Sequence, residues 1–130
     1  MKFLLMKILI IDDNETITKA VSKVLKLKGH DCILVNESKR GLKLISENEY
    51  DLVLLDLAMP ELTGLDLVKK LKPSSKNLSK VVIFTAMSVP PEQLLELKAL
   101  GIRSILKKPF SLTDLDQIIS EQNSSLGISN

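Results

Sequence analysis

The sequence lacks several features that would assign it to common classes of protein. Its one cysteine, Cys32, cannot form a disulfide within the chain, which favours a reducing, cytoplasmic compartment. No stretch reaches the ~18 apolar residues of a membrane span. The short apolar start is interrupted by Lys7 and has no small-residue cleavage site. We therefore expect neither a signal peptide nor insertion into a membrane.

An excess of one charge and glycine-rich loops are also lacking. The chain has 18 Lys and Arg residues against 16 Asp and Glu, a net charge of +2, and these are scattered rather than gathered in blocks. Surfaces that bind nucleic acid are usually basic patches, so direct binding of DNA or RNA is not expected. The absence of a glycine-rich loop excludes a P-loop or Rossmann nucleotide site.

The length of 130 residues corresponds to one ordinary domain. We place this domain at residues 6–121. Residues 1–5 are expected to be a dispensable N-terminal extension, because Met6 would serve equally well as the start. Residues 122–130 are mostly small and polar and are expected to form a flexible C-terminal tail. The chain is expected to be a monomer.

Five short apolar runs alternate with helical patterns along the chain. The runs are mostly continuous, as expected for strands that are covered on both faces of a sheet. Each is followed by a stretch with apolar residues three or four positions apart, which is typical of a helix with one buried face. In the last of these stretches, Ser111 and Asp114 form the pattern of a capping box. The runs comprise residues 8–11, 32–35, 52–55, 81–84 and 102–106.

This alternation predicts an α/β fold, a (βα)5 doubly wound parallel five-stranded sheet with helices on both faces. In such sheets the functional groups lie beyond the carboxyl ends of the strands. Asp12 and Asp13 follow the first run and Asp56 follows the third, so three carboxylates are expected at one edge. At roughly 4 Å and an effective dielectric constant of about 20, each pair of like charges repels by about 4 kcal/mol. Such a cluster requires a cation to offset it.

Two further strand ends bring polar groups to the same edge. Thr85 follows the fourth run and Lys108 follows the fifth. Alone, Thr85 could be a cap or turn residue, and Lys108 could be an ordinary solvated lysine. Because four strand ends carry such groups together, the edge is predicted to be a functional site.

With these residues in this order, the chain resembles the receiver domain of two-component response regulators, in the single-domain, CheY-like form. The resemblance covers about residues 6–121 and implies a flavodoxin-like strand order of 2-1-3-4-5, for which CheY is a standard example. Each motif is weak alone, and their order and spacing make the resemblance specific. The motifs are Asp12-Asp13, Asp56 within LLDLAMP, Thr85-Ala86 and Lys108-Pro109.

The resemblance also implies a chemistry. In receivers the aspartate at the position of Asp56 accepts a phosphoryl group from a histidine kinase or a histidine phosphotransfer protein, acting as a carboxylate nucleophile. Mg²⁺ offsets the negative charge. Its protein ligands would be Asp13, Asp56 and the backbone carbonyl of Ala58, with Asp12 acting through water. Such a module catalyses only its own phosphorylation and dephosphorylation and is not a turnover enzyme.

The same resemblance assigns roles at the other two strand ends. Lys108 would contact a phosphoryl oxygen, and Thr85 would donate a hydrogen bond to the same group and draw its loop inward. Receivers commonly carry an aromatic residue three positions before the lysine, where this chain has Ile105. We therefore expect a modest conformational change on the face formed by the last strand and the last two helices. Pro90 and Pro91 are expected to start the fourth helix.

Four residues outside the motifs also receive expectations from their positions. His30 follows the helix-ending Gly29 and Tyr50 lies in the turn before the third strand, so both are expected at the surface. Cys32 opens a strand and is expected in the core. Leu95 lies off the main apolar stripe of the fourth helix and is a possible exposed anchor for a partner.

Three other functions compete with this interpretation. A haloacid-dehalogenase-type phosphatase would need an aspartate at the position of Ala58. A flavodoxin-like flavin carrier would need a hydroxyl- and glycine-rich loop at the position of Asp12 and Asp13, whose charge would repel the flavin phosphate. A receiver fold that serves only as an interaction module and is never phosphorylated stays open as the alternative.

Overall fold

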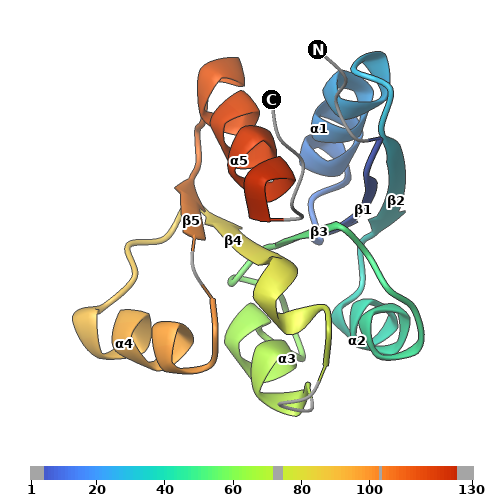
Figure 1. The fold of residues 1–130 in the computed structure, drawn as a ribbon. Helices are drawn as coiled ribbons and strands as arrows, with labels where there is room; N and C mark the ends of the chain where they lie inside the picture. The colour runs from blue at the N-terminus through green and yellow to red at the C-terminus, as the bar shows by residue number, and fades with distance from the viewer. Residues whose placement is uncertain (1–4, 72–74, 103, 126–130) are drawn as a thin grey trace.

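The computed structural model describes residues 5–71, 75–102 and 104–125, and in these ranges strands and helices alternate (Figure 1). The strands are β1 (Lys7–Ile11), β2 (Asp31–Val35), β3 (Leu52–Leu55), β4 (Val81–Thr85) and β5 (Ser104–Lys107). The helices are α1 (Glu15–Leu27), α2 (Ser38–Glu47), α3 (Gly64–Lys70), α4 (Pro91–Ala99) and α5 (Leu112–Ser125), with a short 3₁₀ turn η1 (Leu78–Lys80) before β4.

The strands form one parallel sheet in the order β2-β1-β3-β4-β5. Helices α1 and α5 cover one face of this sheet, and α2, α3 and α4 cover the other (Figure 1). The (βα)5 doubly wound architecture and the strand order expected from the sequence are confirmed.

Burial on both faces explains why the central strands are continuously apolar. Every residue of β3 and the last four residues of β1 are buried, and their side chains alternate between two hydrophobic clusters, one under each layer of helices. Burying one such side chain contributes about 1.5–3 kcal/mol. Strands β2 and β5 lie at the sheet edges and are only partly buried.

Helix boundaries follow capping signals in the sequence. The predicted capping box of α5 is present, since Asp114 N donates to Ser111 Oγ at 3.1 Å and Ser111 N donates to Asp114 Oδ2 at 3.0 Å. A second capping box, formed by Thr63 and Asp66 at α3, was not anticipated. Pro91 is the first residue of α4, so the two prolines start this helix as expected.

The C-terminal boundary differs from the sequence expectation. Helix α5 continues to Ser125, so residues 122–125 are helical rather than part of a flexible tail. Gln122 and Asn123 are buried, and Gln122 Nε2 donates to the carbonyl of Asp51 at 2.7 Å, which attaches the last turn of α5 to the residue before β3. Residues 1–4 and 126–130, for which an extension and a tail were expected, lie outside the described residues.

His30 and Tyr50 were expected at the surface and are instead 5% and 2% exposed. His30 Nδ1 accepts a hydrogen bond from the backbone N–H of Met6 at 3.0 Å, just before β1. Burial, with a further contribution from the charge of Lys28, lowers the pKa of His30. His30 directly precedes β2, and Tyr50 lies two residues before β3. The burial of both depends on packing against other elements, which is not visible in the local sequence.

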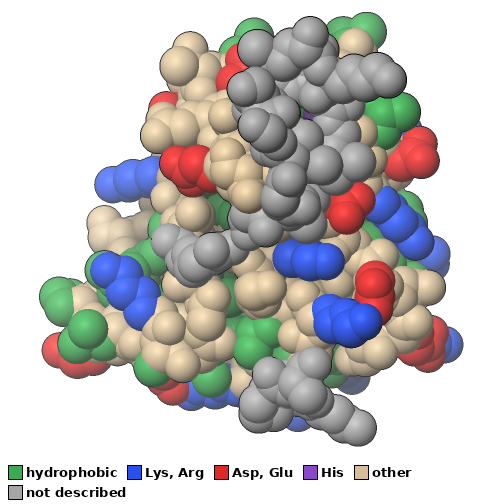
Figure 2. Space-filling view, viewed as in Figure 1, with side chains coloured by type: hydrophobic (Ala, Val, Ile, Leu, Met, Phe, Trp, Pro, Cys, Tyr) green, Lys and Arg blue, Asp and Glu red, His purple; other side chains and the backbone are tan. Residues whose placement is uncertain are grey.

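The surface carries charges of both signs, interspersed with apolar side chains on the face shown in Figure 2. Leu95 is 69% exposed, as expected, and Cys32 is half-buried against the cluster under α1 and α5. Among the described residues, no helix has both the length and the apolar character needed to cross a membrane.

Candidate functional site

The three motif acids meet at the carboxyl edge of the sheet. Asp12 follows β1 and Asp56 follows β3, and the backbone N–H of Asp56 donates to the carbonyl of Ile11 at 2.9 Å. Asp12, Asp13 and Asp56 each offer an oxygen, and these oxygens all lie within 4.8 Å of one another. Asp12 and Asp56 are 1% and 5% exposed, whereas Asp13 faces solvent. The fold therefore produces the clustering of carboxylates that the sequence predicts.

Lys108 supplies a positive charge inside this cluster. Its Nζ lies 2.5 Å from Asp12 Oδ2 and 3.8 Å from Asp56 Oδ1. The ammonium also lies 4.4 Å from the centre of the Phe84 ring, close enough for a cation–π contact. Strand pairing brings it there, because β5 lies beside β4 and Lys108 N donates to the carbonyl of Thr85 at 2.8 Å. One lysine thus faces two buried acids.

The electrostatic balance at Asp56 is unfavourable to its charge. Burial raises the pKa of Asp56, the negative charge of Asp12 raises it further, and Lys108 and the backbone N–H of Ala58 act in the opposite direction. The net direction is upward, so Lys108 and the N–H of Ala58 do not offset burial and the charge of Asp12 together. A further cation at this edge would favour the ionised carboxylate.

Thr85 ends β4 with its side chain 1% exposed. Its Oγ1 accepts a hydrogen bond from the backbone N–H of Met87 at 3.1 Å, which is the turn role that the sequence left open. An accepting hydroxyl keeps its own proton for donation, so this turn and a contact to a ligand are compatible.

Gly64, which the sequence analysis gave no role, shapes the loop that carries Asp56. Its backbone N–H donates to the carbonyl of Leu57 at 3.1 Å. A Cβ at this position would lie 2.4 Å from the carbonyl oxygen of Asp56. Only glycine therefore allows the start of α3 to pack this closely against the site.

Two asparagines near the acids were also missed as site residues. Asn14 caps α1 through its side chain and donates its backbone N–H to Asp12 Oδ1 at 3.0 Å. The side chain of Asn36 donates to the carbonyl of Asp12 at 2.7 Å. The adjacency of Asn14 to the acid pair is a usable sequence signal, whereas Asn36 is distant in sequence and reaches Asp12 only through the pairing of β1 with β2.

The chemistry of the donor set fits a hard divalent cation. Carboxylate oxygens are the ligands that Mg²⁺ prefers, and an exposed member such as Asp13 leaves room for the water that Mg²⁺ usually retains. Burial first, and then the charge of Asp12, raise the pKa of Asp56, so a cation bound here would favour its ionised form. The backbone carbonyl of Ala58, also predicted as a ligand, belongs to an exposed residue in the loop after Asp56.

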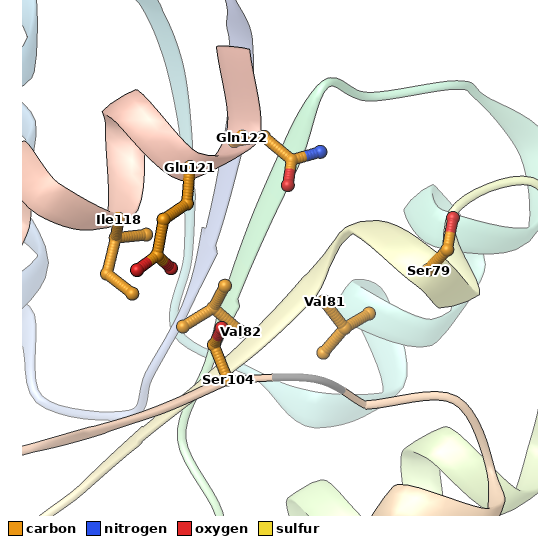
Figure 3. Close-up of a pocket in the computed structure, with 7 residues that line it drawn as sticks. All are labelled: Ser79, Val81, Val82, Ser104, Ile118, Glu121 and Gln122. Atoms are coloured by element: carbon orange, nitrogen blue, oxygen red, sulfur yellow. The ribbon is translucent and has the colours of Figure 1, made fainter. Parts of the chain in front are cut away.

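A separate small cavity lies at the other end of the sheet. It has a volume of about 190 Å³ and lies beside Val81 and Ser104, the first residues of β4 and β5, with Gln122 of α5 opposite them (Figure 3). Because the acids follow the last residues of their strands, this cavity is not part of the acidic site.

Comparisons with known proteins agree on one family. The family model described as response regulator receiver domain matches residues 8–120. The sensory/regulatory protein RpfC of Xanthomonas campestris is 34% identical over 107 residues, which cover 80% of this chain and 15% of that protein. The response regulator MprA of a Mycobacterium species is 31% identical over 109 residues, covering 84% of this chain and 46% of that protein. The chain thus spans less than half the length of these relatives.

Solved structures show the same fold. A response regulator receiver domain protein from Clostridium thermocellum superposes with a TM-score of 0.82 at 29% identity, covering 95% of this chain and 98% of that one. The chemotaxis response regulator CheY4 of Vibrio cholerae gives a TM-score of 0.79 at 26% identity, covering 92% of this chain and 99% of that one.

Proposed function

Because the chain belongs to the response regulator receiver domain family, we propose that Asp56 accepts a phosphoryl group from a histidine kinase or a histidine phosphotransfer protein. The reaction depends on Mg²⁺, and the chain works as a stand-alone receiver that signals by phosphorylation-dependent protein contact. Receiver domains are signalling modules of two-component systems rather than turnover enzymes. The observation that carries the proposal is the buried Asp56, which lies with Asp12 and Asp13 within reach of one cation and 3.8 Å from the ammonium of Lys108.

The transfer itself is a nucleophilic substitution at phosphorus. A carboxylate oxygen of Asp56 attacks the phosphorus of a phosphohistidine, a new P–O bond forms, and the P–N bond breaks. The electron pair of that bond returns to the imidazole nitrogen of the donor. Asp56 must be ionised to attack, so the groups that oppose its raised pKa, Lys108 and the backbone N–H of Ala58, act directly on reactivity.

The protein ligands of the metal would be Asp13, Asp56 and the backbone carbonyl of Ala58, with Asp12 acting through water. When bound, Mg²⁺ would supply positive charge against the negative charge of the phosphoryl group. Lys108 supplies the remaining charge by turning its ammonium from Asp12 toward a phosphoryl oxygen. The hydroxyl of Thr85 donates a hydrogen bond to the same group.

Movement of Thr85 and Lys108 toward the phosphoryl group would be the signal. Shifting a two-state loop from 1:99 to 99:1 requires about 5.5 kcal/mol of differential interaction. One new ionic contact and one hydrogen bond in a buried site are within that range. A partner would then read the changed surface around β4 and β5.

A groove beside the site suits the donor protein. It has a volume of about 510 Å³, lies between α1 and the segment that enters α5, and shares Lys108 with the acid cluster. We infer that it receives the apolar face of a helix of the donor, because a helix seated there lies next to Asp56. The apolar lining includes Ile17, Ala20, Val24, Pro109, Phe110 and Leu112.

The proposal is tested by incubation with a small-molecule phosphodonor and Mg²⁺, followed by intact-mass measurement. The wild-type protein should gain the mass of one phosphoryl group, and the gain should disappear in Asp56→Ala or with EDTA. Asp31→Ala is the matched control. Asp31 is an exposed aspartate at the amino end of β2, whereas the acids of the site follow the carboxyl ends of β1 and β3. A wild-type protein that gains no mass would instead be an interaction module that is not phosphorylated.

A further inference from the structure

The turn between β2 and α2 carries no acid of the site, yet it contacts the loop that bears Asp12. The side-chain amide of Asn36 donates one hydrogen bond to the carbonyl of Asp12 at 2.7 Å and another to Thr18 Oγ1 at 3.2 Å. An amide nitrogen has two protons, so both bonds form at once. Asn36 therefore joins the acid loop to helix α1 through a single uncharged group.

The partner in α1 is itself held firmly. Thr18 is 0% exposed, and its hydroxyl donates to the carbonyl of Glu15 at 3.1 Å while accepting from Asn36. A continuous set of hydrogen bonds thus runs from the carbonyl of Asp12, through Asn36 and Thr18, to the first turn of α1. Asn14 also holds Asp12 in place, because its backbone N–H donates to Asp12 Oδ1.

The same segment reaches the second loop of the site. Ser38, the first residue of α2, is 5% exposed, and its hydroxyl donates to the carbonyl of Pro60 at 3.3 Å. Pro60 lies in the loop after β3 that carries Asp56 and Ala58. The β2–α2 segment therefore contacts both loops that hold the acids, with the shorter bond on the Asp12 side.

We propose that Asn36 is a positioning residue for the metal-binding acids, and that Ser38 supports the opposite loop in the same way. Carboxylates held within 4.8 Å repel one another, so the two loops tend to separate when no metal ion adds to the positive charge of Lys108. Hydrogen bonds to backbone carbonyls resist that separation without adding charge. The acids are then held in place before the metal binds, and less of the binding free energy is lost in ordering the loops.

This inference rests on the proposed function only in naming Mg²⁺ as the ion. The first measurement is isothermal titration of Mg²⁺ into the wild-type protein and into Asn36→Ala. Supporting groups behind metal ligands typically change affinity by about 10–100-fold, so Asn36→Ala should bind Mg²⁺ about tenfold more weakly. Ser38→Ala should show a smaller loss in the same direction.

Asn48→Ala is the matched control. The side chain of Asn48 also donates to a backbone carbonyl, that of Leu44 at 3.3 Å, but at the end of α2 away from the acids. The Asn48→Ala variant should bind Mg²⁺ with the same affinity as the wild type. A Mg²⁺ affinity of Asn36→Ala within twofold of the wild type, or an equal loss in Asn48→Ala, would overturn the proposal.

The second measurement is amide hydrogen exchange in Mg²⁺-free buffer. The amide of Asn14, which is bonded to Asp12 Oδ1, should exchange about tenfold faster in Asn36→Ala, while the amides of β3 keep their wild-type rates. A uniform increase at both places would mean a general loss of stability and would contradict a positioning role.

The two proposals fail separately. If the wild type gains no phosphoryl mass but its Mg²⁺ affinity depends on Asn36, the proposed function is wrong and the positioning role stands. If the wild type is phosphorylated at Asp56 but Asn36→Ala binds Mg²⁺ normally, the proposed function stands and the positioning role is wrong.

Discussion

At the scale of single residues, Asp56 lies in an environment that opposes the charge of its carboxylate. Its carboxylate is buried beside Asp12, so the charged form, which is the form that the proposed phosphoryl transfer requires, is disfavoured. The nearby ammonium of Lys108 reduces this cost without removing it. A residue whose native environment opposes its working state is typical of functional sites.

The first prediction concerns the loss of stability that comes from burying the charged carboxylate of Asp56. Because the pKa of Asp56 is raised, the native state binds more protons than the unfolded state as pH rises through the unfolded pKa to the folded one, and stability falls over that window. Above the folded-state pKa, the buried and ionised carboxylate lowers the stability of the native state by its full amount. Asp56→Asn should therefore raise the free energy of unfolding at neutral pH in EDTA by on the order of 1 kcal/mol.

Urea denaturation at neutral pH, with and without Mg²⁺, measures this effect. Ligand binding to the native state stabilises by about 2.7 kcal/mol at 100 times Kd. Mg²⁺ should therefore stabilise the wild type and have much less effect on Asp56→Asn. Lower stability of Asp56→Asn than of the wild type in EDTA would contradict the electrostatic account.

At the scale of elements, the two ends of the strands differ in the groups that they position. Carboxyl ends hold the site, and amino ends hold buried hydrogen bonds that join the elements. His30, at the turn between α1 and β2, accepts from the N–H of Met6 just before β1. This bond requires a neutral imidazole, because a protonated ring has no acceptor.

The next prediction is an acid dependence of stability from His30. Because burial lowers the pKa of His30 in the folded state, the unfolded state binds more protons than the folded state between the folded pKa and the unfolded pKa of about 6.5. This contribution to stability is therefore fully present above about pH 6.5 and is lost as the pH falls toward the folded pKa. Between pH 7 and 5 the wild type should lose about 1 kcal/mol more than His30→Asn, which keeps an acceptor and does not titrate. Parallel stability–pH curves for the two proteins would exclude this role.

At the scale of the whole molecule, the acid cluster and the groove beside it lie next to each other and share Lys108. Helix α1 and the segment entering α5 lie on one face of the sheet, so chemistry at Asp56 and docking on that face can be separated by mutation. Ala20 is exposed in this groove and contributes no group to the acid cluster.

The last prediction uses this separation. Ala20→Arg should leave phosphorylation by a small-molecule donor within about twofold of the wild type, because the acids are untouched. Transfer from a histidine kinase or phosphotransfer protein that labels the wild type should fall by about tenfold or more, since a charged group then occupies an apolar contact, a loss of roughly 1.4 kcal/mol or more. Radiolabel transfer measures both rates. Equal rates for wild type and variant with the protein donor would exclude the groove as the docking surface.

Much of the fold and of the site follows from the sequence. Continuous apolar runs separated by amphipathic stretches determine a parallel sheet covered on both faces, and the position of Asp12, Asp56, Thr85 and Lys108 after such runs determines that they share an edge. These inferences hold because strand periodicity and the geometry of parallel sheets are local rules. The modest conformational change expected on the face of α4, β5 and α5, where Ile105 stands in place of an aromatic residue, stays a prediction.

Only the tertiary structure decided which residues support that edge. Asn36 meets Asp12, and His30 meets Met6, across 24 positions of sequence, and the burial of Tyr50 and the last turn of α5 depend on packing under the sheet. A hydrogen bond between distant segments leaves no periodic signal in either one. The sequence therefore determined which polar groups share the edge, and the pairing of the strands decided what holds them in place.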